Sequence, residues 1–163
     1  MRIIRGALAA TAAMLAALTL WAASAHADIA PPQPFYADST NPNFDTCPHG
    51  ITKGTLLWHT PGPVAPVAVD VSGEVVDRPT ADGSTAGCAP DDYSSTAIFT
   101  AYSGSAVVGY KTVTVDNGAK QFQFTLGGNS TASALTQLTV QVCRDPVHTV
   151  PPSYCGKTVT YRG

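Results

Sequence analysis

Apolar and polar residues alternate along the chain after Gly54, and this alternation constrains the fold more than any other feature of the sequence. It is clearest over residues 121–126 and 137–142, where every second residue is apolar. A period of two matches a strand with one dry and one wet face, whereas a helix would need a period near 3.6. Gly, Pro, Asn and Ser interrupt the pattern at short intervals, so the sequence predicts a series of short antiparallel strands.

We expect an all-β fold of about seven strands, which is typical of a two-sheet sandwich of immunoglobulin type. The expected strands cover residues 54–59, 65–77, 95–103, 106–115, 119–126, 134–143 and 155–162. Asn117-Gly118 is a favoured pair for a tight hairpin, so we expect the strands on either side of it to pair with each other. Ser72-Gly73 predicts a bulge or a break in the second strand.

The four cysteines are even in number, which predicts two disulfides if the chain is exported. We expect the pairs Cys47–Cys88 and Cys143–Cys155, because the second pair closes a short Pro-rich loop between two strand-like segments. A zinc site is the competing interpretation. The cysteine spacings lack any Cys-x-x-Cys pair and therefore favour disulfides over metal.

Residues 1–27 have the pattern of a secretory signal peptide. Arg2 and Arg5 are followed by an uncharged apolar run over residues 7–23, and Ala25-His26-Ala27 suits cleavage after Ala27. The run could instead anchor the chain in a membrane, but it is at the short limit for spanning hydrocarbon. Its Ala- and Thr-rich composition is typical of a bacterial signal. We therefore expect a secreted, extracellular protein with no membrane segment after cleavage.

The mature chain is expected to hold one domain over residues 51–163, preceded by an extended Pro- and Asn-rich arm over residues 28–50. Loss of Arg2 and Arg5 leaves seven basic against eleven acidic residues, a net charge of −4. The basic residues are scattered, so the sequence does not predict a nucleic-acid partner. We expect a monomer whose partner is an extracellular ligand or protein. Phe35, Tyr36 and Phe44 of the arm could pack on the sandwich or contact that partner.

Catalytic chemistry has little support in the sequence. His49, His59 and His148 each stand alone, and no Gly-x-Ser-x-Gly motif marks a nucleophile, so a secreted hydrolase is only an alternative. The acidic residues in and before the loop that follows the expected strand 65–77 fit a solvated loop better than a calcium site, because they do not form an Asp-x-Asp-x-Asp-Gly pattern. These residues are Asp77, Asp82, Asp91 and Asp92. We predict a non-enzymatic binding or interaction module without metal or cofactor.

The segment from Cys143 to Cys155 is the strongest candidate for a binding loop. In a sandwich, the chain entry before the first strand and the loops over residues 78–94 and 144–154 share one end, and a rigid end with long loops is where binding sites are commonly built. His148 and Tyr154 are the predicted contact residues. A protease-inhibitor-like loop is an alternative. Four strand aromatics could instead form a sugar-stacking platform, although packing is their commoner role. These are Trp58, Tyr102, Tyr110 and Tyr161.

Residues 88–95, Cys-Ala-Pro-Asp-Asp-Tyr-Ser-Ser, are similar to a loop of the neocarzinostatin-type apoproteins. In outline, a secreted seven-stranded sandwich with two disulfides also resembles that family, whose members hold an enediyne chromophore in a cleft. The resemblance implies a small-molecule carrier as a further alternative. The family closes two short loops with its disulfides, whereas a Cys47–Cys88 bridge would span about forty residues. No binding residue of the family is therefore assigned to a position in this chain.

Overall fold

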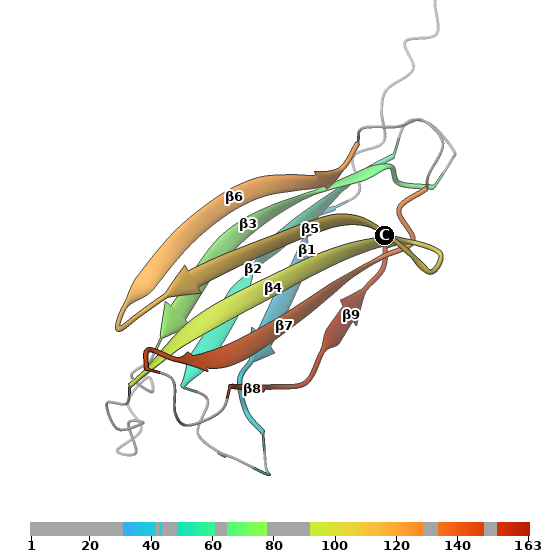
Figure 1. The fold of residues 1–163 in the computed structure, drawn as a ribbon. Coiled ribbons are helices and arrows are strands. Elements are labelled where there is room, and N and C mark those ends of the chain that lie inside the picture. The colour runs from blue at the N-terminus through green and yellow to red at the C-terminus, as the bar shows by residue number, and fades with distance from the viewer. Residues whose placement is uncertain are drawn as a thin grey trace, which may run out of the picture.

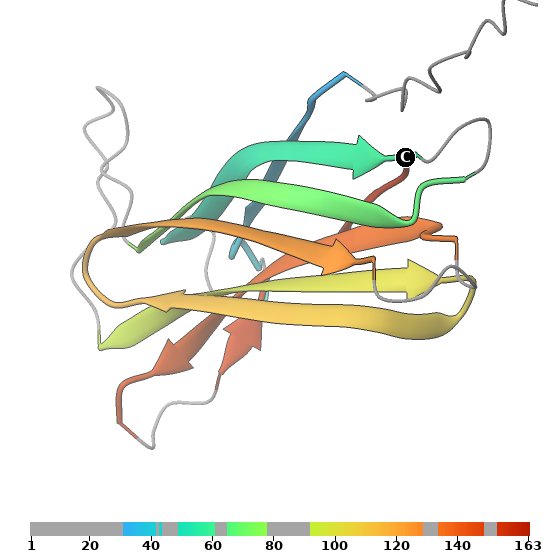
Figure 2. The same ribbon diagram turned by 90° about the horizontal axis from the view of Figure 1, so that it is seen from above.

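The structure is a computed structural model that describes residues 31–41, 43, 49–60, 65–77, 92–128, 134–148 and 153–163. The predicted signal peptide, Phe44, Cys47 and Cys88 lie outside these residues. Within them the protein is all-β, and its strands form two antiparallel sheets, as expected for a β-sandwich (Figures 1 and 2).

Each sheet combines consecutive strands with a strand that is distant in sequence, β6 beside β3 in the first sheet and β7 beside β4 in the second. The first sheet has the order β1-β2-β3-β6 and consists of β1 (Gln33–Asp38), β2 (Gly50–His59), β3 (Ala68–Asp77) and β6 (Ala119–Gly127). The second sheet has the order β5-β4-β7-β8, with β9 also pairing with β7. It consists of β4 (Tyr93–Ser103), β5 (Ala106–Val115), β7 (Gln137–Pro146), β8 (Tyr154–Cys155) and β9 (Val159–Tyr161).

The predicted arm contributes a strand to the sandwich, which differs from the expected domain boundary at residue 51. β1 pairs antiparallel with β2, and Phe35 at its centre is only 4% exposed. The physical reason is that Phe35 supplies apolar surface to the core while its neighbours Pro34 and Tyr36 face solvent. At the other end of the chain, the expected strand 155–162 divides into β8 and β9. The described residues therefore hold nine strands rather than about seven.

The turn at Asn117-Gly118 is present, but the predicted hairpin is wrong. Asn117 has a φ of 50°, as a tight turn requires, yet β5 and β6 belong to different sheets. Asp77 at the end of β3 explains the difference. Its backbone nitrogen donates to the Gly118 carbonyl oxygen at 2.8 Å, and its Oδ2 accepts from the Asn117 nitrogen at 2.8 Å. These bonds hold the turn against β3, so the chain crosses to the first sheet and β6 pairs there.

Ser72-Gly73 does not interrupt β3, because the ladders with β2 and β6 continue through both residues. Gly73 instead lies in a cross-strand row whose four members are Phe35, Gly54, Gly73 and Phe122. A Cβ atom on Gly73 would come 2.3 Å from the Lys53 carbonyl oxygen, so the close approach of β2 and β3 requires glycine. The bulge in the described strands lies on β5, where Val108 is the extra residue opposite Ala101 and Tyr102.

Aromatic rings from both sheets fill the centre of the core. Phe35 and Phe122 stack with centroids 6.5 Å apart, and both pack edge-on against Phe99 of the second sheet at 5.8 and 5.2 Å. Phe124 adds a further edge contact with Phe99 at 5.2 Å. Such edge-to-face pairs contribute stability beyond the area they bury. The two glycines between Phe35 and Phe122 leave the rings room to approach across the sheet.

Candidate functional site

Strand ends from both sheets meet at the end of the sandwich that is lowest in Figure 1. Gly50 at the start of β2 lies opposite Asp77 at the end of β3. In the second sheet, Ser95 near the start of β4 lies opposite Arg144 near the end of β7, and Cys143 lies opposite Cys155. We call this region, from Gly50 and Asp77 to Cys155, the disulfide-braced end. The chain before β2 and the starts of the loops that follow β3 and β7 thus lie at one end, as predicted from the sandwich topology.

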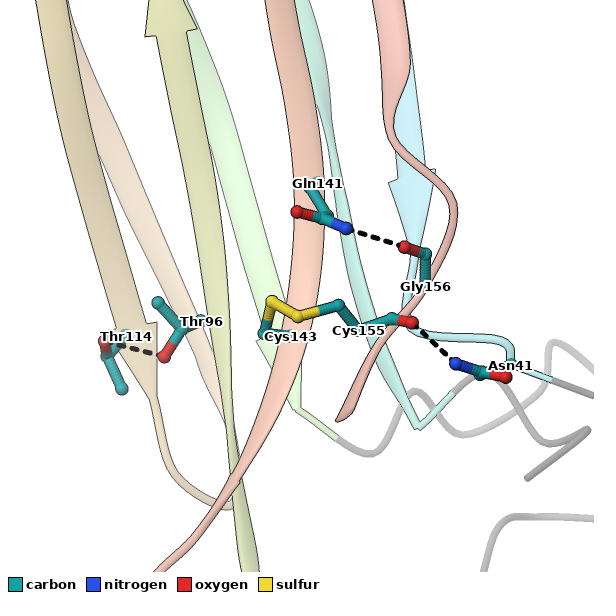
Figure 3. Close-up of a disulfide and its surroundings, with 7 residues drawn as sticks. All are labelled: Asn41, Thr96, Thr114, Gln141, Cys143, Cys155 and Gly156. Atoms are coloured by element: carbon teal, nitrogen blue, oxygen red, sulfur yellow. Dashed lines mark hydrogen bonds between the residues drawn. A yellow bond between two sulfur atoms is a disulfide. The ribbon is translucent and has the colours of Figure 1, made fainter. Parts of the chain in front are cut away.

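The predicted disulfide between Cys143 and Cys155 is confirmed (Figure 3). The two residues are directly opposite on β7 and β8, with their Cα atoms 3.9 Å apart. Side-chain amides fix the same segment from both sides. Asn41 donates to the Cys155 carbonyl oxygen at 2.9 Å, and Gln141 donates to the Gly156 carbonyl oxygen at 2.9 Å. The short strand β8 is therefore joined to β7 and to the chain that follows β1.

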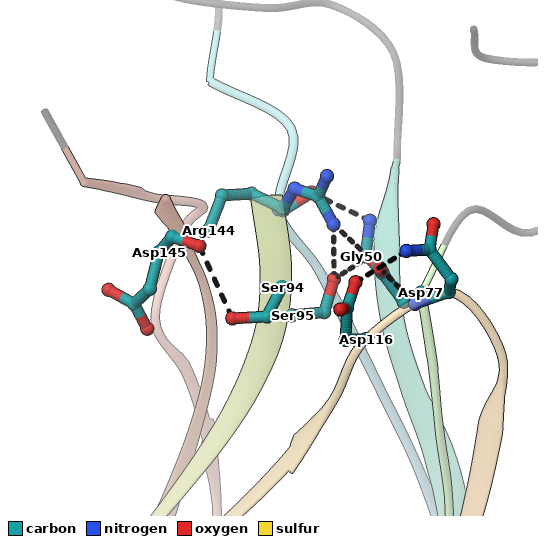
Figure 4. Close-up of polar contacts among 9 residues, drawn as sticks. Gly50, Asp77, Ser94, Ser95, Asp116, Arg144 and Asp145 are labelled. Carbon is teal, nitrogen blue, oxygen red and sulfur yellow. Dashed lines mark hydrogen bonds and ion pairs between the residues drawn. The ribbon is translucent and has the colours of Figure 1, made fainter. Parts of the chain in front are cut away.

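The residue after Cys143, Arg144, forms a buried ion pair with Asp77 (Figure 4). The side chains of Arg144 and Asp77 are fully buried, and Arg144 Nη1 donates to Asp77 Oδ1. The Ser95 hydroxyl lies between them: it donates to Asp77 Oδ1 at 2.6 Å and accepts from Arg144 Nη1 at 2.7 Å. With Asn117 bound to the second carboxylate oxygen, Asp77 accepts hydrogen bonds from three chain segments. The network joins β3, β4, β7 and the turn before β6.

Burial makes this network sensitive to the loss of any member. An unpaired buried charge costs several kcal/mol, and good geometry with further hydrogen bonds is what offsets that cost. The network also continues toward the disulfide. The Arg144 guanidinium carbon lies 5.5 Å from the centroid of the Tyr93 ring, and Tyr93 packs edge-on against Tyr154 at 5.7 Å. Tyr154 precedes Cys155 in the chain, so these ring contacts lead from the ion pair to the residue next to the disulfide.

The two predicted contact residues have different environments. His148 is exposed, as expected, and so is its neighbour Val147, at 51%. Tyr154 is only 8% exposed. The reason is its register: Tyr154 is paired with Arg144, whose side chain faces inward, and paired residues share a face. Its ring therefore packs against Tyr93 instead of offering contact area. Asp145, Pro146, Val147, His148 and Ser153 line an open depression of about 500 Å³ beside this loop.

One of the three histidines lies far from the other two in the structure. His49 is buried before the first residue of β2, while His59 is the last residue of the same strand and lies at the opposite end of the sandwich. His59 Nε2 lies 2.7 Å from Asp70 Oδ2. The Thr125 hydroxyl donates to the other oxygen at 2.5 Å and is the main cause that lowers the pKa of Asp70, with His59 adding to it and partial burial opposing it. This pair joins β2 and β3 at the end of the sandwich opposite the braced end.

The four strand aromatics do not form a common platform either. Trp58 is 2% exposed and its indole nitrogen donates to Gln33 Oε1 at 2.9 Å, while Tyr161 packs against the core. Tyr110 is 60% exposed on β5, on the other sheet from Trp58. Packing therefore accounts for two of the four residues.

No sequence motif marks Ser95 or Arg144 as a site residue, and Asp77 was predicted only as part of a solvated acidic loop. Alternation is the signal that could have located them. Arg144 follows Leu138, Val140 and Val142 at intervals of two, all inward-facing, and Asp77 continues the buried positions of β3 in the same way. Among the described residues, no group of three or more His, Cys, Asp or Glu side chains is placed to hold a metal ion. Asp82 and Asp91 lie outside those residues.

None of the described residues belongs to a helix that is long and apolar enough to cross a membrane. Comparisons with protein-family models, with curated proteins and with solved structures find no match to this chain.

Proposed function

We propose that the protein is an exported, non-enzymatic binding module that presents the loop after β7 to an extracellular partner. The observation that carries the proposal is the buried Arg144–Asp77–Ser95 network beneath the origin of that loop. The network and the Cys143–Cys155 disulfide hold both ends of the loop on strands of the core. A loop fixed in this way loses little conformational entropy on binding, which strengthens binding.

The exposed side chains nearest this anchor are the proposed contact residues. Val147 offers apolar area and His148 a ring that can donate or accept a hydrogen bond, and both border the depression formed with Asp145, Pro146 and Ser153. A rigid scaffold with an exposed loop at one end is a common arrangement for recognition. Tyr154 is proposed to support the loop from below through its contact with Tyr93.

We also propose that the sandwich is of immunoglobulin-like type. Two features of the strand order support this. The consecutive strands β4 and β5 pair within one sheet, and the chain then crosses to β6 in the other sheet before returning to β7 beside β4. Crossings of this kind between two packed antiparallel sheets are characteristic of Greek-key sandwiches.

The test begins with the full-length chain expressed in a bacterial host and recovered from the medium. The mass of the recovered protein reports whether cleavage occurs after Ala27. The recovered protein is then immobilised and exposed to extracellular protein and cell-wall fractions, and the captured partner is titrated. We expect the double variant Val147→Ser/His148→Ala to bind about tenfold more weakly with unchanged thermal stability. Thr112→Ala, an exposed change on β5, serves as the control. Equal affinity of the two variants, or capture of nothing, would contradict the proposal.

A further inference from the structure

The outer face of the first sheet carries two parallel rows of polar side chains. One row consists of Thr55, Ser72 and Gln123, and the other of Lys53, Glu74 and Gln121. Each row crosses β2, β3 and β6 in register, and the two rows are two residues apart along every strand. Their side chains point away from the core because the residues between them, Gly54, Gly73 and Phe122, belong to the inward-facing set.

An open depression of about 610 Å³ lies at these two rows. Its lining residues are Gly54, Thr55, Ser72, Gly73, Gln121, Phe122 and Gln123. Neither glycine can carry a side chain, since a Cβ on Gly54 would be 2.1 Å from the Ser72 carbonyl oxygen. On the inner face, the stacked rings of Phe35 and Phe122 support this part of the sheet. The depression is therefore formed by rigid backbone with hydrogen-bonding side chains around it.

The charges at the edge of the depression compensate one another. Lys53 Nζ lies 3.3 Å from Glu74 Oε1, and Gln121 donates to Glu74 Oε2 at 2.8 Å. The remaining polar side chains of the lining are two neutral hydroxyls and an amide, with the Thr55 and Ser72 oxygens 3.5 Å apart, and none of the other lining residues is charged. Hydroxyls and amides both donate and accept hydrogen bonds, as sugar hydroxyls do. A site for an anionic ligand would instead need basic side chains that are not paired with acidic ones. An apolar ligand would leave these polar groups without hydrogen-bond partners.

Aromatic area lies at the β1 end of the same face. Tyr36 is in register with Lys53 and is 48% exposed, and the exposed Pro34 is in register with Thr55. Tyr161 fixes the β1 backbone here, because its hydroxyl donates to the Tyr36 carbonyl oxygen at 2.9 Å. Partial burial, with Asp38 nearby, raises the pKa of Tyr36 above its ordinary value, at which a tyrosine hydroxyl is already protonated at neutral pH. A flat ring beside a row of hydroxyls and amides matches a sugar, which has an apolar face and a polar rim.

We infer that this face binds a neutral polysaccharide, laid across β2, β3 and β6 with one sugar ring against Tyr36. This second site is independent of the loop after β7. It uses the polar residues Thr55, Ser72, Gln121 and Gln123 as hydrogen-bonding partners, and its openness suits a chain of several sugars rather than an enclosed small molecule.

The experiment is affinity electrophoresis of the protein that is recovered from the medium after expression of the full-length chain, in gels containing one soluble polysaccharide each. Dextran, laminarin, arabinoxylan and galactomannan are the neutral probes, and polygalacturonate is the anionic one. We expect at least one neutral probe to retard the protein, and we expect the retarding probe's Kd to rise roughly two- to tenfold in Gln123→Ala and in Tyr36→Ala. Polygalacturonate should cause less retardation than that probe.

Matched controls lie on the outer face of the second sheet. Gln137→Ala and Tyr110→Ala remove the same side-chain types from β7 and β5, and they should leave retardation unchanged. Val147→Ser/His148→Ala should also leave it unchanged, which separates this site from the proposed function. Absence of retardation in all four neutral gels would overturn the inference. Equal losses in the variants and their controls, or stronger binding to polygalacturonate, would overturn it as well.

Discussion

Two aspartates of the same strand, β3, make closely similar contacts at opposite ends of the molecule. Asp77 accepts a hydrogen bond from a hydroxyl, that of Ser95, and pairs with the cation Arg144. Asp70 accepts from the hydroxyl of Thr125 and pairs with His59. The two residues are seven positions apart, an odd number, so alternation places Asp77 toward the core and Asp70 toward solvent.

The two pairs make similar contacts but differ in burial. We therefore expect burial, rather than the contacts themselves, to decide how much each pair contributes to the free energy of unfolding. Asp77 and Arg144 have fully buried side chains, so each charge depends on its partner. The side chains of His59 and Asp70 are 39% and 35% exposed, so water can replace the partner of either. Exposed pairs contribute about 0–1 kcal/mol at most. Removal of the Asp77 carboxylate should therefore destabilise the protein strongly, while removal of the Asp70 carboxylate at the opposite end should have little effect.

The largest expected effect is that of Asp77→Ala. The substitution leaves the Arg144 charge buried without its carboxylate and removes the acceptor that holds the turn at Asn117. We expect the free energy of unfolding to fall by roughly 3–5 kcal/mol, the usual cost of breaking a buried pair from one side. Urea unfolding at neutral pH, monitored by circular dichroism, measures it.

Asp70→Ala is the control for that measurement, because it removes the same side chain from the same strand at an exposed position. We expect a loss of about 1 kcal/mol or less for the control. In the double variant Asp77→Ala/Arg144→Met, part of the loss should be recovered, since the buried charge is gone. Equal losses for Asp77→Ala and Asp70→Ala would show that burial does not distinguish the two ends.

The second effect tests whether the disulfide adds to the braced end independently. Cys143 and Cys155 are 12 residues apart in sequence. On the chain-entropy model, the variant Cys143→Ser/Cys155→Ser should lose about 3 kcal/mol. Urea unfolding of this variant, compared with Asp77→Ala and with the combination of both changes, measures the coupling. A combined loss smaller than the sum of the two would show that ion pair and disulfide act as one unit.

The third effect concerns Gly73, which lies between the two aspartates on β3. Gly73→Ala forces a Cβ against the Lys53 carbonyl oxygen, and overpacking of this kind costs about 1–3 kcal/mol. Gly118→Ala is the matched control, because the nearest atom to its added Cβ is 4.0 Å away. We expect the control to change the free energy of unfolding by about 0.5 kcal/mol or less. A thermal or urea midpoint that falls equally in both variants would contradict the close approach of β2 and β3.

The sequence predicted most of the strands because alternation is a local signal. It was clear in β6 and β7, where every second residue faces the core. The hairpin at Asn117 failed for a physical reason: turn residues specify a tight turn but not which sheet the next strand joins. That choice depends on Asp77, which is 40 residues away in sequence. β1 was missed because its short strand stands among Pro and Asn residues, and only its register with β2 makes it part of the core.

The candidate site was predictable in location but not in composition. Topology placed the loop origins at one end, and the spacing of Cys143 and Cys155 identified the disulfide. Arg144 shows the limit, since its charge argues for solvent while its position in the alternation of β7 argues for the core. The conflict is resolved only by partners from β3 and β4 that sequence alone does not bring together. The prediction that Tyr154 is a contact residue did not anticipate its burial for a similar reason, because that burial follows from its register with Arg144.

The smallest expected effect is a pH dependence at the exposed pair. The folded pKa of Asp70 lies below its ordinary value, chiefly because the Thr125 hydroxyl donates to the carboxylate, with His59 adding to the effect. The pair therefore contributes stability above the unfolded pKa of about 3.9, and that contribution is lost as the pH falls through the lower folded value. Thr125→Val should destabilise the protein slightly at pH 7, and the difference from the parent protein should vanish near pH 2. Urea unfolding at both pH values measures this. A difference of the same size at pH 2 would mean that Thr125 acts through packing, and the exposed end would then differ from the braced end in chemistry as well as in burial.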